Sequence, residues 1–109
     1  MITHASDSIP SFAERWDPSD NDWVWISWEN KLGGESIATS TWVLPAGWTE
    51  EDSQADQTVQ DSDGTSYANS NGVRLSTTKT TGTHKITNRV TFSGSRSLDR
   101  SVFVTVKEL

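Results

Sequence analysis

Cysteine is absent from this sequence of 109 residues, which excludes disulfide bonds, thiolate catalysis and cysteine-ligated zinc. Aliphatic residues are also scarce, since hydrophobic residues of all kinds make up only 32% of the chain. No stretch approaches the ~20 apolar residues of a membrane helix, and no charged-then-apolar leader opens the sequence. We therefore expect one small domain, made in a cytoplasm, with no cofactor and no membrane partner.

Positive charge is sparse as well. Lys and Arg number 9 against 15 Asp and Glu, which gives a formal net charge of −6. Proteins that bind nucleic acids use clustered Lys and Arg to displace the counterions of phosphates, and no such cluster occurs here. The same acidity disfavours an anionic membrane surface. We expect the partners to include neither nucleic acid nor membrane.

Residues with catalytic or metal-binding chemistry form no complete pattern. The two histidines, His4 and His84, have no serine in a strand–turn–helix elbow to act on, and both are expected at the surface. The acidic residues 50–52 are consecutive, whereas a glycosidase holds two carboxylates about 5–10 Å apart across a cleft. Residues 61–64 (Asp-Ser-Asp-Gly) resemble the start of a calcium loop, but the later ligands are missing. An Asx turn is expected there instead. We predict no catalytic residue and no metal site.

Short segments of alternating polarity dominate what remains, and no segment of 10–12 residues shows helical spacing. Six or seven short strands with turn signals between them are typical of an all-β sandwich, and we expect the immunoglobulin-like class with antiparallel pairing. The expected strands are residues 23–28, 36–44, 57–60, 72–78, 84–93 and 101–107.

The alternation also assigns faces, because successive side chains of a strand point to opposite sides. In residues 23–28, Trp23 and Trp25 share one face. The other face carries Val24, Ile26 and Trp28. In residues 36–44, Ile37 and Val43 share one face. The residues expected to point inward from residues 72–78 and 101–107 are Val73, Leu75, Val102, Val104 and Val106, with Phe103 outward. Residues 84–93 place Ile86, Asn88, Val90 and Phe92 together on one side.

Two parts of the chain show little regular pattern. Residues 1–22 are polar and contain Pro10 and Pro18, which favour extended backbone before them, so we expect an extended N-terminal arm ahead of a sandwich over residues 23–109. Residues 49–71 are acidic at first and then rich in Ser, Asp, Asn and Gly. They predict a long loop that holds one short strand at most.

Six tryptophans are the most informative feature of the composition. A sandwich of this size cannot easily turn all of them inward, so we expect one or two to lie at an interface, where tryptophan is enriched as an anchor. Exposed rings at Trp23, Trp25 or Trp48 would also suit stacking on sugars, which leaves a carbohydrate-binding module as an alternative. The interface candidates are Phe12, Trp16, Trp23, Trp25, Trp48 and Phe103.

Several segments resemble one protein family. They are residues 17–28, which open with Asp-Pro and end in Trp-Val-Trp-Ile-Ser-Trp, and residues 33–47 (Gly-Gly-Glu-Ser-Ile-Ala-Thr-Ser-Thr-Trp-Val-Leu-Pro-Ala-Gly). Near the end, residues 82–91 (Gly-Thr-His-Lys-Ile-Thr-Asn-Arg-Val-Thr) and 96–106 (Arg-Ser-Leu-Asp-Arg-Ser-Val-Phe-Val-Thr-Val) continue the likeness. Together they resemble the fiber–tail adaptor proteins of tailed bacteriophages. The likeness omits residues 1–16 and the 50–71 stretch.

The resemblance implies a non-enzymatic structural protein of the virion with an immunoglobulin-like fold. It implies partners among other virion proteins of the tail, connector, fiber or capsid, and several copies in a symmetric assembly. The family carries no catalytic motif, so no site residues are transferred. A capsid decoration or head–tail joining protein is the nearest alternative.

Overall fold

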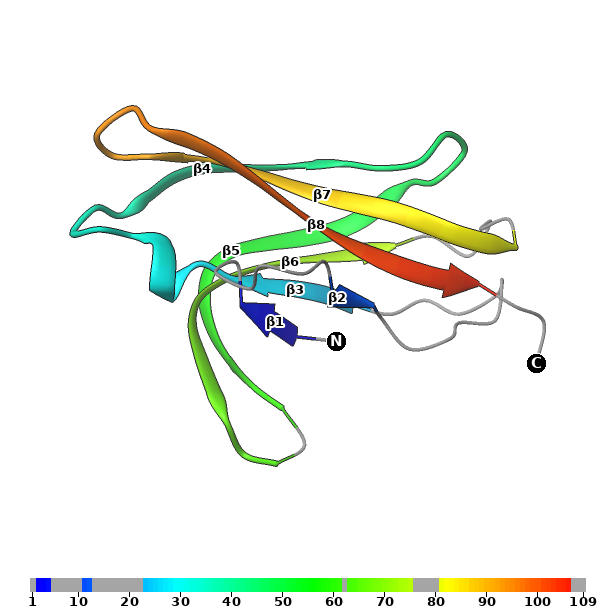
Figure 1. Cartoon of the computed structure of the whole chain (residues 1–109), viewed down its shortest axis with the longest axis horizontal. Coiled ribbons are helices and arrows are strands. Elements are labelled where there is room, and N and C mark those ends of the chain that lie inside the picture. The colour runs from blue at the N-terminus through cyan, green and yellow to red at the C-terminus, as the bar shows by residue number, and fades with distance from the viewer. Residues whose placement is uncertain (1, 5–10, 13–22, 62, 76–80, 107–109) are drawn as a thin grey trace.

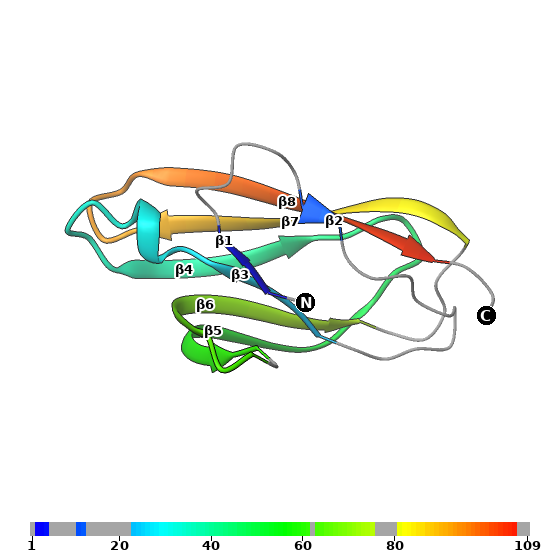
Figure 2. The same cartoon turned by 60° about the horizontal axis from the view of Figure 1, so that its bottom comes forward.

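Two β-sheets pack against each other in the computed structural model, which describes residues 2–4, 11–12, 23–61, 63–75 and 81–106. The first sheet has the order β1 (Ile2–His4), β3 (Trp23–Ser27), β6 (Ser66–Leu75) and β5 (Glu50–Gln60). The second has the order β2 (Ser11–Phe12), β8 (Ser97–Val106), β7 (Gly82–Phe92) and β4 (Ile37–Val43). Figures 1 and 2 show the two layers from two sides. The prediction of an all-β sandwich is confirmed.

The strand order is that of an immunoglobulin constant-type domain, which places strands A, B, E and D in one sheet and C, F and G in the other. Here β1, β3, β6 and β5 take the first four positions, and β4, β7 and β8 take the last three. The six long strands pair antiparallel. The two short strands β1 and β2 instead pair parallel, with β3 and β8 respectively. Both fall within residues 1–22, most of which lie outside the described residues, so the extended arm remains a prediction.

One hydrophobic core fills the space between the sheets. Trp28 and Phe92 meet there edge to face, with ring centroids 5.9 Å apart, an arrangement that aromatic pairs favour. The buried hydrophobic residues are Val24, Ile26, Trp28, Trp48, Val73, Leu75, Ile86, Val90, Phe92, Val102, Val104 and Val106. The residues predicted to point inward from the last three expected strands are therefore buried, and Asn88, which shares a side with Ile86, Val90 and Phe92, is buried with them.

A β-bulge changes the faces of β4. The register with β7 shifts between Ile37 and Thr39, and a bulge of this kind turns the following residues over relative to a regular strand. Ile37 consequently packs against the core together with Trp42 and Leu44. The simple alternation placed Ile37 on the face of Val43, and that assignment is wrong: Val43 is 46% exposed.

The stretch expected to be a long loop is a hairpin. Residues 49–71 contain all of β5 and the first half of β6, and Figure 1 shows this hairpin bending away from the rest of the sandwich. Its sequence hides the strands because β5 is exposed almost throughout, so no buried residue marks an alternation. Three register shifts also interrupt the pairing of β5 with β6.

A short 3₁₀ helix, η1 (Glu29–Lys31), follows β3 and leads into the turn at Gly33 and Gly34. Arg96, in the connection between β7 and β8, holds this segment, because its Nη2 donates to the carbonyl oxygens of Lys31 at 2.6 Å and Leu32 at 3.1 Å. Within the described ranges, no helix combines the length and the apolar character needed to cross a membrane.

Candidate functional site

Groups with catalytic potential are dispersed over the sandwich. His84 lies in β7, half-buried against the ring of Trp48 with centroids 4.9 Å apart, whereas Glu50, Glu51 and Asp52 are exposed on β5. His4 belongs to β1, and its side chain lies outside what the structure describes. Over the described ranges, no three His, Asp or Glu residues gather in a way that would hold a metal ion.

The calcium-like segment 61–64 is built as a turn around one carboxylate. Asp61 Oδ1 accepts from the backbone N–H of Asp63 at 2.9 Å and of Thr65 at 3.0 Å, and Oδ2 accepts from the hydroxyl of Tyr67 at 3.3 Å. The backbone N–H of Gly64 closes the turn on the Asp61 carbonyl. The predicted Asx turn is confirmed. The Asp61 carboxylate stabilises the turn between the two strands of the hairpin.

A pair of tryptophans marks the outer face of the first sheet. Trp23 and Trp25 alternate with the buried residues of β3, are half-buried, and stack with centroids 5.3 Å apart and planes inclined by 18°. Gly72, on the neighbouring strand β6, pairs with Trp25. A Cβ at that position would lie 2.5 Å from Trp25 Cε3, so the indole rests directly on the glycine backbone. This aromatic pair is positioned by both strands.

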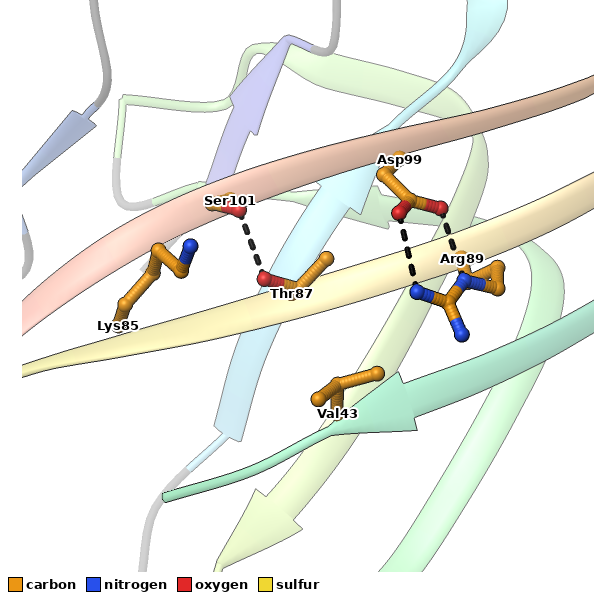
Figure 3. A pocket seen from close by; sticks show the side chains of 6 residues that line it. All are labelled: Val43, Lys85, Thr87, Arg89, Asp99 and Ser101. Carbon is orange, nitrogen blue, oxygen red and sulfur yellow. Dashed lines mark hydrogen bonds and ion pairs between the residues drawn. The ribbon is translucent and has the colours of Figure 1, made fainter.

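The outer face of the second sheet is polar and slightly hollowed (Figure 3). A hollow of about 280 Å³ is lined by Val43, Lys85, Thr87, Arg89, Asp99 and Ser101. Arg89 Nε and Nη2 donate to the two carboxylate oxygens of Asp99 at 3.1 and 3.2 Å, and this hydrogen bond raises the pKa of Arg89 above its usual value. Beside them Thr87 and Ser101 share a hydrogen bond of 2.7 Å. The face is therefore a ladder of cross-strand polar pairs.

Charge is divided between the two hairpins. Six acidic residues and no basic residue lie between positions 50 and 63, and the other nine acidic residues equal the nine Lys and Arg in number. The whole net charge of −6 thus belongs to β5 and its turn. The β7–β8 hairpin is the opposite, since residues 81–106 hold four basic residues and one acidic residue. The two hairpins therefore offer unlike electrostatic surfaces.

The predicted interface residues fall in different environments. Trp48 is 8% exposed and packs in the core, so it is not available as an exposed anchor or as a sugar platform in this conformation. Phe103 is half-buried in β8 opposite Lys85. Phe12 belongs to β2, with its side chain outside the described part, and Trp16 lies outside the described residues. Among the four candidates whose side chains the structure describes, it brings Trp23 and Trp25 together.

One buried polar cluster was not expected from the sequence. Asn88 points inward from β7, and its Oδ1 accepts from Trp28 Nε1 at 2.9 Å and from Asn71 Nδ2 at 3.0 Å. Its Nδ2 donates to Ser40 Oγ and to the Thr41 carbonyl, both at 2.9 Å. The signal that could have revealed the cluster was an asparagine at an inward position of an otherwise apolar alternation.

The sequence of this chain matches one known protein family. Residues 17–105 match the family described as podophage GP4 fiber-tail adaptor protein gp77. The chain belongs to this family. As a fiber-tail adaptor family member it is a structural protein of phage virions, in agreement with the resemblance carried by its sequence motifs. No curated protein and no solved structure matches the chain. The match covers most of the sandwich, including both outer faces described above.

Proposed function

We propose that this chain is a non-enzymatic adaptor that joins the fibers of a podophage to its tail or connector. The observation that carries the proposal is the family match over residues 17–105. An adaptor must contact two different partners, and a sandwich meets that need when its two outer faces differ in chemistry. The proposed function therefore resides in surfaces and needs no reactive cleft.

The tryptophan pair is the first of these surfaces. Aromatic side chains that remain half-buried on a sheet face are suited to anchor a partner, because tryptophan supplies much contact area for little conformational entropy. Gly72 keeps the face flat beneath Trp25. We assign Trp23 and Trp25 as anchors for one virion partner.

The acidic β5–β6 hairpin is the second of these surfaces, and the polar ladder on the outer face of the other sheet is the third. The β5–β6 hairpin bends away from the sandwich (Figure 1), and residues 50–63, which form β5 and its turn, carry six acidic residues and no basic residue. The electrostatic field of this negative charge speeds and orients the approach of a basic partner. A protein that presents apolar and charged surfaces separately is suited to hold two partners in a fixed relation.

Complementation of a phage that lacks the gene tests the proposal. Particles assembled without the chain should contain tails but lose their fibers, as measured by electron microscopy and by mass spectrometry of purified particles. The double variant Trp23→Ala, Trp25→Ala should restore fewer fibers than the wild type, whereas Thr83→Ala, at an exposed position of the opposite sheet, should restore them fully. Melting of each purified variant controls for folding. A full set of fibers on particles that lack the chain would refute the proposal.

The copy number separates this function from the nearest alternative. An adaptor is expected in the small number of copies that a symmetric tail requires, whereas capsid decoration requires hundreds. Quantitative mass spectrometry against the portal and the major capsid protein measures the ratio. Stoichiometry close to that of the capsid protein would favour decoration.

A further inference from the structure

The two long edge strands of the sandwich differ in how they are protected. β5 ends the first sheet and carries four acidic residues and three register shifts, which are devices that stop an edge from pairing with another chain. β4 ends the second sheet and contains no charged residue. After its single shift, residues 39–43 run in regular register with β7. Within the described residues, the other side of β4 pairs with no strand.

The outward face of this edge is apolar or weakly polar. Thr39, Thr41 and Val43 point outward, and all three are exposed. Val43 is the one large hydrophobic residue among the described positions that is classed as exposed, at 46%. It lies at the rim of the hollow on the same face (Figure 3). A strand laid beside β4 would cover it.

We propose that β4 pairs antiparallel with β4 of a second copy of this chain, around a twofold axis at Thr41. This register places Thr41 opposite Thr41, Thr39 opposite Val43 and Ser40 opposite Trp42. Each pair then joins residues of the same face, as antiparallel pairing requires, and the methyl group of Thr39 covers the exposed Val43 of the other copy. The two second sheets become one continuous sheet.

Charge favours this strand as the place where two copies meet. The net charge of −6 makes copies repel each other, yet none of that charge lies on β4. The acidic residues 50–52 follow β4 at its Val43 end. Antiparallel pairing separates the two Val43 residues by four residue rises, about 13 Å, which exceeds the Debye length at physiological salt. A twofold contact also requires a self-complementary strand, and the short uncharged run of residues 39–43 supplies one.

Sedimentation velocity over a concentration series of the purified protein tests the contact. The wild type should show a monomer–dimer equilibrium. Thr41→Lys places like charges opposite each other at the axis and should raise the dimer dissociation constant by about twofold to fivefold. Gln54→Lys, with the same change of charge on the exposed β5 edge, should change it far less. Mixing Thr41→Lys with Thr41→Glu should restore a dimer, because opposite charges then meet at the axis.

The absence of cysteine allows a second, direct test. Facing residues of antiparallel strands have Cα atoms about 4.5–5.5 Å apart, within the range that a disulfide spans. Under mild oxidation Thr41→Cys should form a disulfide-linked dimer much faster than Gln54→Cys. This readout survives even if the charged variants fold poorly.

Three results would overturn the proposal. They are a wild-type protein that stays monomeric at every concentration, a Thr41→Lys variant that dimerises like the wild type, and equal cross-linking at positions 41 and 54. Cross-linking of Cys at position 41 to a different virion protein in particles, with none between copies, would also overturn it and assign the edge to that protein. The contact is independent of fiber attachment, since the purified chain alone is measured.

Discussion

Replacing Asn88 with alanine should remove a large part of the stability of this sandwich. The side chain is fully buried and uses all of its hydrogen-bonding capacity, with two bonds accepted and two donated. It joins Trp28 and Asn71, which are next to or within the first sheet, to Ser40 and Thr41 of the second. Asn71 in turn accepts from the backbone N–H of Asp56 at 2.9 Å, at one of the irregular points of β5. The amide therefore links both sheets and three of their strands.

The expected loss follows from the groups that the substitution leaves behind. In Asn88→Ala the indole N–H of Trp28 and the amide N–H of Asn71 stay buried without this acceptor. An unsatisfied buried polar group costs about 1–3 kcal/mol, so the two donors together cost about 2–6 kcal/mol. A domain of this size has a total free energy of unfolding of about 5–15 kcal/mol. The loss is therefore large enough to unfold a fraction of the protein.

Urea unfolding followed by tryptophan fluorescence measures this loss, with Thr83→Ala as a surface control that should stay within about 0.5 kcal/mol of the wild type. Asn88→Asp adds a second test, since it keeps the acceptors but buries a carboxyl group. Burial raises the pKa of such a group, so this variant should lose stability as the pH rises through that pKa and regain it on acidification. If Asn88→Ala lowered the free energy of unfolding by less than about 1 kcal/mol, the cluster would not hold the sheets together as argued.

Three further substitutions test other parts of the structure. Gly72→Ala forces the new methyl group against Trp25 and should cost about 1–3 kcal/mol, with a changed tryptophan emission; an unaltered melting temperature would contradict the contact. Arg96→Ala removes the hydrogen bonds to Lys31 and Leu32 and should lower the free energy of unfolding by about 1 kcal/mol. Arg96→Lys should not restore this stability, because lysine lacks the forked donors of arginine. Full recovery of the melting temperature in Arg96→Lys would show that charge alone matters. Asp99→Asn should leave the melting temperature unchanged, because its pair with Arg89 is exposed.

The sequence predicted the parts of the fold in which burial alternates along a strand. From Ile86 to Phe92 in β7 and from Val102 to Val106 in β8, every second residue is apolar or Asn88, and each of these residues is buried. The same rule located Val24 and Ile26 in β3 and set Trp23 and Trp25 on the other face. These strands have one face in the core, so the amino-acid pattern records their geometry directly.

The rule failed where the core does not decide the residue type. β5 is an exposed edge strand, and neither of its faces needs to be apolar. Its acidic and polar residues therefore predicted a loop. In β4 the bulge moved Ile37 to the face of Trp42, and a bulge leaves no signal in the polarity of single residues. The β5 edge is specified by hydrogen bonds instead, such as that from Asp56 N–H to the amide of Asn71.

The candidate surfaces were only partly predictable for the same reason. Excess tryptophan indicated an anchor, but residue type alone did not separate the stacked pair at Trp23 and Trp25 from Trp48, which packs in the core beside His84. That distinction depends on the partner strand, because Gly72 leaves room for one indole on the outer face.

Cryo-electron microscopy of purified virions is the most direct measurement of where this chain acts. Density for the two-sheet sandwich should appear between the tail and the base of the fibers, with Trp23 and Trp25 against a neighbouring chain. Density on the capsid lattice, or particles that contain none of this chain, would contradict the account.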